Sequence, residues 1–269
     1  MAGFVPSVIT RKLSLSQNSS CFVTMQSFLL HFLKEVNISL YMSSFEKHKM
    51  KTHSKTTYCL NHYSKENYMS IISRYNRVSY VFDTMEIPME HMWFSKWRKN
   101  ILSGLSGRVL DLGIGTGKNI SYYPDECEVV GVDISNKMLS HAKRKAREGK
   151  RKNISLFQMD AENLGFKDDS FDYVITTFVL CSIPDPVAAL KEMKRLCRPD
   201  GMVINLEHMK SDNKSIAFVE NIFNPLTVAA TGVNINRETV ENIRKSGLNI
   251  VEVRNMAFLD VFRLIKSRP

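Results

Sequence analysis

The strongest constraint on the fold is a short apolar run that ends in an acidic residue and three alternating glycines. It reads Val109-Leu110-Asp111-Leu112-Gly113-Ile114-Gly115-Thr116-Gly117. An apolar run of this length, bounded by a turn signal, is typical of a buried strand. Glycine has no Cβ, so alternating glycines let the chain turn sharply and let a ligand lie against main-chain N–H groups. The run therefore predicts a nucleoside-type ligand at the end of a strand.

The spacing of the glycines separates two kinds of nucleoside ligand. A dinucleotide site reads G-x-G-x-x-G and holds a pyrophosphate at the start of the next helix. Here the order is D-x-G-x-G-x-G, and Asp111 stands two residues before the first glycine. A carboxylate at that place repels a pyrophosphate but suits a cationic ligand. A nicotinamide dehydrogenase is therefore disfavoured.

Further motifs follow along the chain. Glu128 to Asp133 is an apolar run that closes on an acid, Gln158 to Glu162 contains an Asp-Ala pair, and Phe171-Asp172 precedes a hydrophobic run. Cys197-Arg198-Pro199-Asp200-Gly201 has the composition of a turn into another strand. In this order, and over about residues 70 to 265, the motifs resemble those of class I S-adenosylmethionine-dependent methyltransferases.

The resemblance implies a cofactor, S-adenosyl-L-methionine, and a set of residues that bind it. In that family the acid after the second strand, here Asp133, accepts hydrogen bonds from the ribose, and the Asp-Ala pair lies near the adenine. The implied cofactor-binding residues are Asp111, Gly113, Gly115, Gly117, Asp133, Ile134, Asp160, Ala161 and Thr177. Arg74 to Tyr80 resembles the segment that covers the cofactor in ubiquinone and menaquinone methyltransferases, which adds Tyr75; ordinary helix packing explains that aromatic equally well.

The coarse pattern predicts a Rossmann-like α/β fold. A helix is expected from Pro88 to Arg98 and another after the glycines at Lys118. Strands are expected near Val109, Val129, Ser155, Val174, Val203, Ile250 and Phe262. Most alternate with helices, which favours a seven-stranded, mostly parallel sheet covered on both faces. Because no helix separates Asn249–Arg254 from Leu259–Lys266, these two segments are expected to form an antiparallel hairpin at the sheet edge.

The residues after the fifth strand bear on the methyl acceptor. Glu207-His208, the Pro-containing insertion from Phe218 to Gly232, and Asn236 to Thr239 resemble the membrane-associated thiol and lipid methyltransferase relatives of the quinone enzymes. The resemblance implies a small lipophilic acceptor: a quinone, a phospholipid or a thiol. His208 is the candidate general base, although a lone histidine is more often a hydrogen-bonded residue at a strand end.

Three other residues near this region have candidate roles. Asn236 is a candidate N-cap of the last helix. Arg237 fits two roles, orienting an acidic group of the acceptor or pairing with Glu241 on the helix surface. Cys181 is expected to be a buried structural cysteine.

Charge and composition limit the partners. The net charge is +10, and its densest run, Lys143 to Lys152, belongs on the outer face of a helix whose apolar stripe is Met138, Leu139, Ala142 and Ala146. A solvated face is the simpler interpretation, and nucleic acid is an unfavoured partner. The five cysteines contain no C-x-x-C pair, so neither a metal site nor a disulfide framework is indicated.

A noncatalytic S-adenosylmethionine-binding or RNA-associated protein is the alternative function.

The chain is expected to have two parts: an N-terminal extension, residues 1–62, and a methyltransferase domain, residues 63–269. Residues 1–34 lack acidic side chains, which fits an organellar targeting segment, a disordered tail or an early start codon. No apolar run reaches the roughly 20 residues of a membrane-spanning helix. A cytoplasmic protein, with or without peripheral membrane contact, is therefore expected, and the pattern leaves the oligomeric state open.

Overall fold

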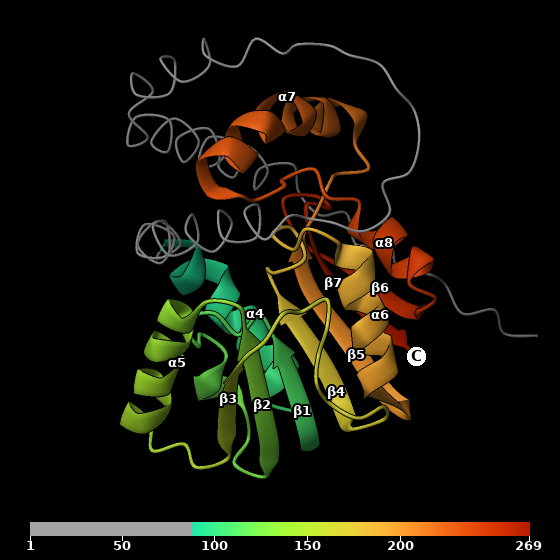
Figure 1. The fold of residues 1–269 in the computed structure, drawn as a ribbon. Helices are drawn as coiled ribbons and strands as arrows, with labels where there is room; N and C mark the ends of the chain where they lie inside the picture. Colours follow the sequence, from blue (N-terminus) through green and yellow to red (C-terminus); the bar gives the residue numbers. More distant parts are fainter. Residues whose placement is uncertain (1–87) are drawn as a thin grey trace, which may run out of the picture. The chain divides into compact units, whose positions relative to one another are not determined.

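The computed structural model describes residues 88–269, in which strands and helices alternate (Figure 1). Helical residues begin at Pro88 and Met89, at the border of this part. In chain order the elements are η1 (Glu90–Phe94, a π-helical turn), α4 (Ser95–Leu102), β1 (Gly107–Leu112), η2 (Ile120–Tyr122, a 3-10 turn), β2 (Cys127–Asp133), α5 (Asn136–Glu148), β3 (Ile154–Gln158), β4 (Phe171–Thr177), α6 (Pro186–Leu196), β5 (Cys197–His208), α7 (Lys214–Thr231), α8 (Thr239–Lys245), β6 (Asn249–Ala257) and β7 (Phe262–Arg268).

The strands form one sheet in the order β3-β2-β1-β4-β5-β7-β6. The first five are parallel to their neighbours, and β7 is antiparallel to both β5 and β6. The predicted seven-stranded, mostly parallel sheet with an antiparallel C-terminal hairpin is confirmed. The strand order reverses between β1 and β4, and ligands of such sheets bind outside the carboxyl ends of the strands at this switch point.

The central strands β1, β2 and β4 are largely buried on both faces, which explains their long apolar runs. Leu110 and Val174 pack in the core that includes residues of α6 and α8, whereas the neighbouring Val109 and Ile175 pack in the core on the α4 side. On α5, the expected stripe contributes Leu139, Ala142 and Ala146 to a further cluster beside β2 and β3. The helices therefore cover the sheet from both sides, as expected.

Three helices begin at the edge of the sheet where the parallel strands end, and each has a side-chain cap. The Ser135 hydroxyl accepts from Met138 N, and Asp185 Oδ1 accepts from Val187 N and Ala188 N. Asn213 Oδ1 likewise accepts from Ser215 N at the start of α7. These caps fix how the chain turns from strand to helix beside the expected site.

Two sequence expectations were wrong. The helix expected after the glycines is only the 3-10 turn η2, because Pro124 follows closely and leaves too few residues for an α-helix. Asn236 does not cap α8, which begins at Thr239; instead Asn236 Nδ2 donates to Asn221 Oδ1 at 2.9 Å. Within residues 88–269, no helix combines the length and apolar character needed to cross a membrane.

Candidate functional site

The glycine loop after β1 has no room for a side chain at two of its glycines and has room at the third. All three have positive φ, +71° at Gly113, +57° at Gly115 and +79° at Gly117. A Cβ on Gly113 would lie 2.4 Å from Val179, and one on Gly117 would lie 2.6 Å from Ile120. A Cβ on Gly115 would meet nothing closer than the Gly113 carbonyl oxygen at 3.9 Å. Of the three, only Gly115 therefore has open space where a side chain would stand, into which a ligand could fit.

Asp133, the last residue of β2, closes one side of this loop. Its Oδ2 accepts from Gly115 N at 3.0 Å and its Oδ1 from Ser135 N at 2.8 Å. Burial raises the pKa of this carboxyl. Each oxygen keeps a lone pair for a further donor, as a vicinal diol would supply. The half-buried Ile134 follows, and its carbonyl oxygen accepts from Gln158 Nε2 at 2.9 Å.

Asp111 lies beneath the loop and is completely buried. Its Oδ2 accepts from Asn119 Nδ2 at 2.9 Å and from the Tyr123 hydroxyl at 2.8 Å. Its Oδ1 has no hydrogen-bond partner among residues 88–269. Burial raises the pKa of Asp111 to about 6. A buried carboxylate oxygen without a partner is costly, so a cationic donor from a ligand would be stabilising there.

A buried arginine connects the glycine loop to the end of β4. Arg98 Nη1 donates to Asn119 Oδ1 at 2.6 Å and to Thr177 Oγ1 at 2.8 Å. Arg98 Nε lies 3.4 Å from Glu90 Oε1, and its guanidinium lies 5.3 Å from the centre of the Phe178 ring. Thr177 is thus a member of this network. Nothing in the sequence pattern indicated a site role for Arg98, which is on α4, outside the motifs.

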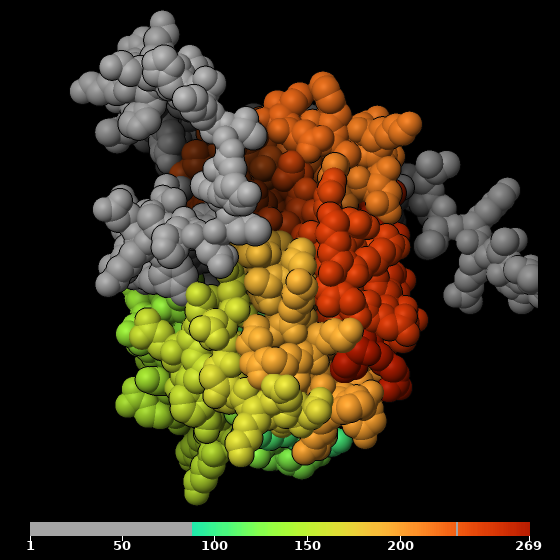
Figure 2. All heavy atoms as spheres, turned by 45° about the vertical axis from the view of Figure 1, so that its right-hand side comes forward, coloured from blue at the N-terminus to red at the C-terminus, as the bar shows by residue number. Residues whose placement is uncertain are grey.

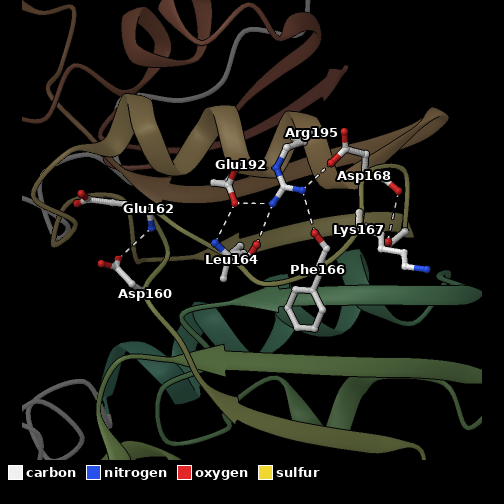
Figure 3. A network of polar contacts seen from close by, with 9 residues as sticks. Asp160, Glu162, Leu164, Phe166, Lys167, Asp168, Glu192 and Arg195 are labelled. Carbon is white, nitrogen blue, oxygen red and sulfur yellow. Dashed lines mark hydrogen bonds and ion pairs between the residues drawn. The ribbon is translucent and has the colours of Figure 1, made fainter.

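The Asp160-Ala161 pair lies on a loop that α6 holds in place (Figure 3). Asp160 Oδ1 accepts from Glu162 N at 2.9 Å, and Glu162 Oε1 accepts from Asp185 N at 2.9 Å. Farther along, Arg195 donates to the carbonyl oxygens of Leu164 and Phe166, both at 2.9 Å. The loop is therefore fixed by backbone contacts to a helix, and Asp160 and Ala161 are half-buried.

Glu207 and His208 are the last two residues of β5, and their surroundings differ. Glu207 is completely buried, and its Oε2 accepts from Val179 N at 2.9 Å and Leu180 N at 3.2 Å. Burial raises the pKa of Glu207 to about 7. Since Val179 is the residue packed on Gly113, Glu207 holds the loop after β4 against the glycine loop. The sequence pattern did not indicate this role.

His208 belongs to an aromatic cluster at the ends of the strands. Its ring lies 5.5 Å from Phe262, and Phe262 also contacts Phe178 and Phe94. Burial lowers the pKa of His208 to about 4, so the imidazole is neutral near neutral pH. Phe178 has φ of +60°, a left-handed conformation that is strained for a side chain of this size. Arg98 and the neighbouring rings hold it there.

Of the remaining candidates from the sequence, Arg237 and Cys181 contact the surrounding protein, and Tyr75 lies outside the described residues. Arg237 Nη2 donates to the carbonyl oxygens of Ile183 at 2.9 Å and Cys181 at 3.3 Å, and no contact with Glu241 is seen in residues 88–269. Cys181 is buried, and burial raises the pKa of its thiol to about 12, as expected of an inert cysteine. Tyr75 and the domain boundary expected after residue 62 lie outside the described residues. No trio of potential metal ligands is found within residues 88–269.

Comparison with known proteins identifies the domain. Residues 110–205 match the family model described as methyltransferase domain. The chain is 39% identical over 115 residues to phosphatidylethanolamine N-methyltransferase from Cereibacter sphaeroides, covering 42% of this chain and 57% of that one. It is 33% identical over 144 residues to demethylmenaquinone methyltransferase from Staphylococcus saprophyticus, covering 49% and 60%. The chain thus spans less than two thirds of these relatives' lengths.

The fold has a matching solved structure. A SAM-dependent methyltransferase from Thermotoga maritima superposes with a TM-score of 0.57 at 18% identity, covering 73% of this chain and 98% of that one. The open glycine, the two acidic strand ends and the unpartnered Asp111 oxygen fit a nucleoside that carries a cationic group. Residues 110–205 therefore form a methyltransferase domain, and the chain has the Rossmann-like fold of S-adenosylmethionine-dependent methyltransferases.

Proposed function

We propose that this protein transfers a methyl group from S-adenosylmethionine to a small lipophilic acceptor, such as a quinone, a phospholipid or a thiol. The observations that carry the donor half of the proposal are the open space at Gly115, whose N–H donates to Asp133, and the buried Asp111, whose Oδ1 has no hydrogen-bond partner within residues 88–269. The named activities of the two relatives support the acceptor half, since one is a phospholipid methyltransferase and the other a quinone methyltransferase.

When bound, S-adenosylmethionine supplies an electrophilic methyl group on a sulfonium. In the proposal, Asp133 accepts from the ribose hydroxyls, with Ile134 beside it. Gly113, Gly115 and Gly117 give the backbone its turn, and Asp111 Oδ1, which has no hydrogen-bond partner within residues 88–269, would accept from a cationic donor. Asp160 and Ala161 lie at the adenine, on the loop that Arg195 holds. Thr177 acts indirectly, through its bond to Arg98.

Catalysis in such a site depends mainly on alignment of donor and acceptor and on exclusion of water. The aromatic cluster of Phe94, Phe178, His208 and Phe262 supplies an apolar surface at the strand ends for a lipophilic acceptor. His208 is proposed as the base for an acceptor that must lose a proton. Because burial lowers its pKa to about 4, it is a neutral imidazole throughout the physiological pH range but a weak base, so it can serve only an acceptor that loses its proton readily, such as a thiol.

The role of His208 has its own test. His208→Phe keeps the ring packing on Phe262 but removes the nitrogen atoms. If His208 is the base, kcat falls by about 100-fold with little change in KM for the donor. A loss of less than about threefold would remove the base from the mechanism and leave alignment alone.

The proposal as a whole is tested by incubating the full chain with methyl-labelled S-adenosylmethionine and separate pools of phospholipid, quinone, thiol and RNA. Label is expected in one lipophilic pool, and mass spectrometry of the product then identifies the acceptor. Asp133→Ala is the matched control, because it should lose the donor while the fold is kept. Donor binding without label in any pool would support the noncatalytic alternative, and label in RNA alone would support an RNA-modifying enzyme.

A further inference from the structure

Helix α7 buries three polar side chains and exposes three large apolar ones. Glu220, Thr227 and Thr231 are buried, with 7%, 9% and 6% of their surface exposed. Phe218 and Ile222, one turn apart, are 65% and 56% exposed, and Val219 is 42% exposed. A helix on a globular protein in water normally has the opposite arrangement.

The inward polar face is held by specific hydrogen bonds. Glu220 Oε2 accepts from Ser211 N at 3.0 Å, and Asn224 Oδ1 accepts from Ile235 N at 2.8 Å. The Thr227 hydroxyl lies 3.1 Å from the carbonyl oxygen of Val233, to which it donates. These contacts tie α7 to the segments immediately before and after it. The exposure of the apolar side is therefore fixed by the polar contacts on the other side.

The charge of the outward surface favours one kind of partner. Lys214 and Glu220 are the only ionisable residues of α7, and Glu220 is buried while Lys214 is exposed. The helix therefore shows apolar side chains and a positive charge, and no carboxylate of its own. The whole chain has a net charge of +10. An apolar helix surface with basic character is complementary to an anionic lipid surface.

The position of α7 connects this surface to the acceptor side of the site. The helix follows β5 after the short segment 209–213, so it begins close to the strand end that carries His208. In Figure 2 the orange atoms of this part of the chain lie at the outer surface of the molecule. Figure 1 shows α7 beyond the carboxyl ends of β4 and β5.

We infer that the exposed side of α7, around Phe218, Val219 and Ile222, lies in the interface of an anionic lipid bilayer. The inference deepens the proposed function and rests on it for one point, that the acceptor is lipophilic and reaches His208 from that bilayer. The contact itself needs neither donor nor turnover. It is peripheral, since no helix in the described part of the chain spans a membrane.

The experiment uses the full chain and sedimentation with phosphatidylcholine vesicles, with and without phosphatidylglycerol. Phe218→Ser/Ile222→Ser removes the apolar surface, and Val251→Ser/Val253→Ser on β6 is the matched control, because those valines are 50% and 46% exposed elsewhere. We expect the α7 variant to partition at least about tenfold less than the wild type, and the control to be unchanged. Lys214→Gln should lower partitioning about fivefold, and only with phosphatidylglycerol.

Equal partitioning of the wild type and the α7 variant would overturn the inference, and so would absence of wild-type binding to both vesicles. A wild-type dimer that Phe218→Ser/Ile222→Ser dissociates would also overturn it, because the surface would then bind a second copy. Calorimetric S-adenosylmethionine binding on the same samples separates the two claims. Donor binding and labelling without vesicle binding would support the proposed function and contradict the membrane inference. Vesicle binding without donor binding would support the membrane inference and contradict the proposed function.

Discussion

The two ends of the proposed reaction lie in regions that are held together differently. Around the glycine loop, backbone lies against side chains without spare room, as at Gly113 and Gly117, and the Asp133 carboxylate binds two backbone N–H groups at the end of β2. Around α7, polar side chains hold the backbone at a few points while large apolar side chains face outward. Tight backbone packing suits a ligand of one fixed shape. A surface of exposed apolar side chains suits a partner without fixed shape.

The largest expected effect tests whether the glycine loop is rigid because of packing. Gly113→Ala puts a methyl group 2.4 Å from Val179 at a positive φ. Overpacking and left-handed strain together predict a loss of about 3 kcal/mol in the free energy of unfolding. Gly115→Ala places its methyl group in open space, so the free energy of unfolding should fall by only about 1 kcal/mol. Donor binding should weaken more in Gly115→Ala than in Gly113→Ala. Denaturant unfolding measures the stability of the two variants, and calorimetry measures their donor binding. Equal losses of stability would contradict the difference in packing between Gly113 and Gly115.

The second effect concerns the acid at the end of β2. Asp133→Ala removes the acceptor of the Gly115 and Ser135 N–H groups and of the proposed ribose contact. A loss of about 2 kcal/mol in donor binding, or roughly 30-fold in Kd, is expected. Asp125→Ala, whose side chain is 88% exposed, is the control and should leave Kd unchanged. Unaltered affinity in Asp133→Ala would remove this residue from the donor site.

The third effect is a pH dependence where the two regions meet. Burial raises the pKa of Glu207 to about 7, above the value near 4.5 expected when unfolded. The folded state then binds more protons between these values, so stability falls as pH rises through this window. Glu207→Gln should reduce this fall by about 2 kcal/mol between about pH 5 and 8. Asp111, whose pKa burial raises to about 6, contributes a remaining slope of the same sign.

Urea unfolding at several pH values measures that slope. Glu241→Gln is the control, because Glu241 is about half exposed on α8. An unchanged slope in Glu207→Gln would mean that this carboxyl keeps an ordinary pKa when folded.

The smallest effect tests the loop that carries Asp160. Arg195→Lys keeps the charge but loses the fork that reaches both Leu164 and Phe166 carbonyl oxygens. Donor Kd should rise about threefold, with little change in stability. Arg244→Lys is the control, since the ion pair that Arg244 makes within residues 88–269 is with the exposed Glu241, at 3.8 Å. If both variants bind the donor alike, α6 does not position this loop.

The sheet was predictable because its strands are runs of apolar residues with acids or glycines at their ends. The positions of Asp111, Asp133 and the glycines at the ends of β1 and β2 were predictable for the same reason, since their spacing is local in the chain, whereas their contact with a donor stays a prediction. The Arg98 network was not, because Arg98 and Thr177 are 79 positions apart and meet only after folding. The cap expected at Asn236 was wrong because Asn236 contacts α7, and that contact could not be anticipated before α7 was known as one continuous helix.

The order of strands in the sheet has a consequence for how this chain folds as it is synthesised. β7 lies between β5 and β6 and is made after both. Until it emerges, β6 has no neighbour in the sheet, and β5 presents an unpaired edge. Strands β1 to β5 are made first and already pair with one another, and domains fold progressively from the N-terminal side during translation. Nascent chains halted between β6 and β7 would expose that edge to other chains.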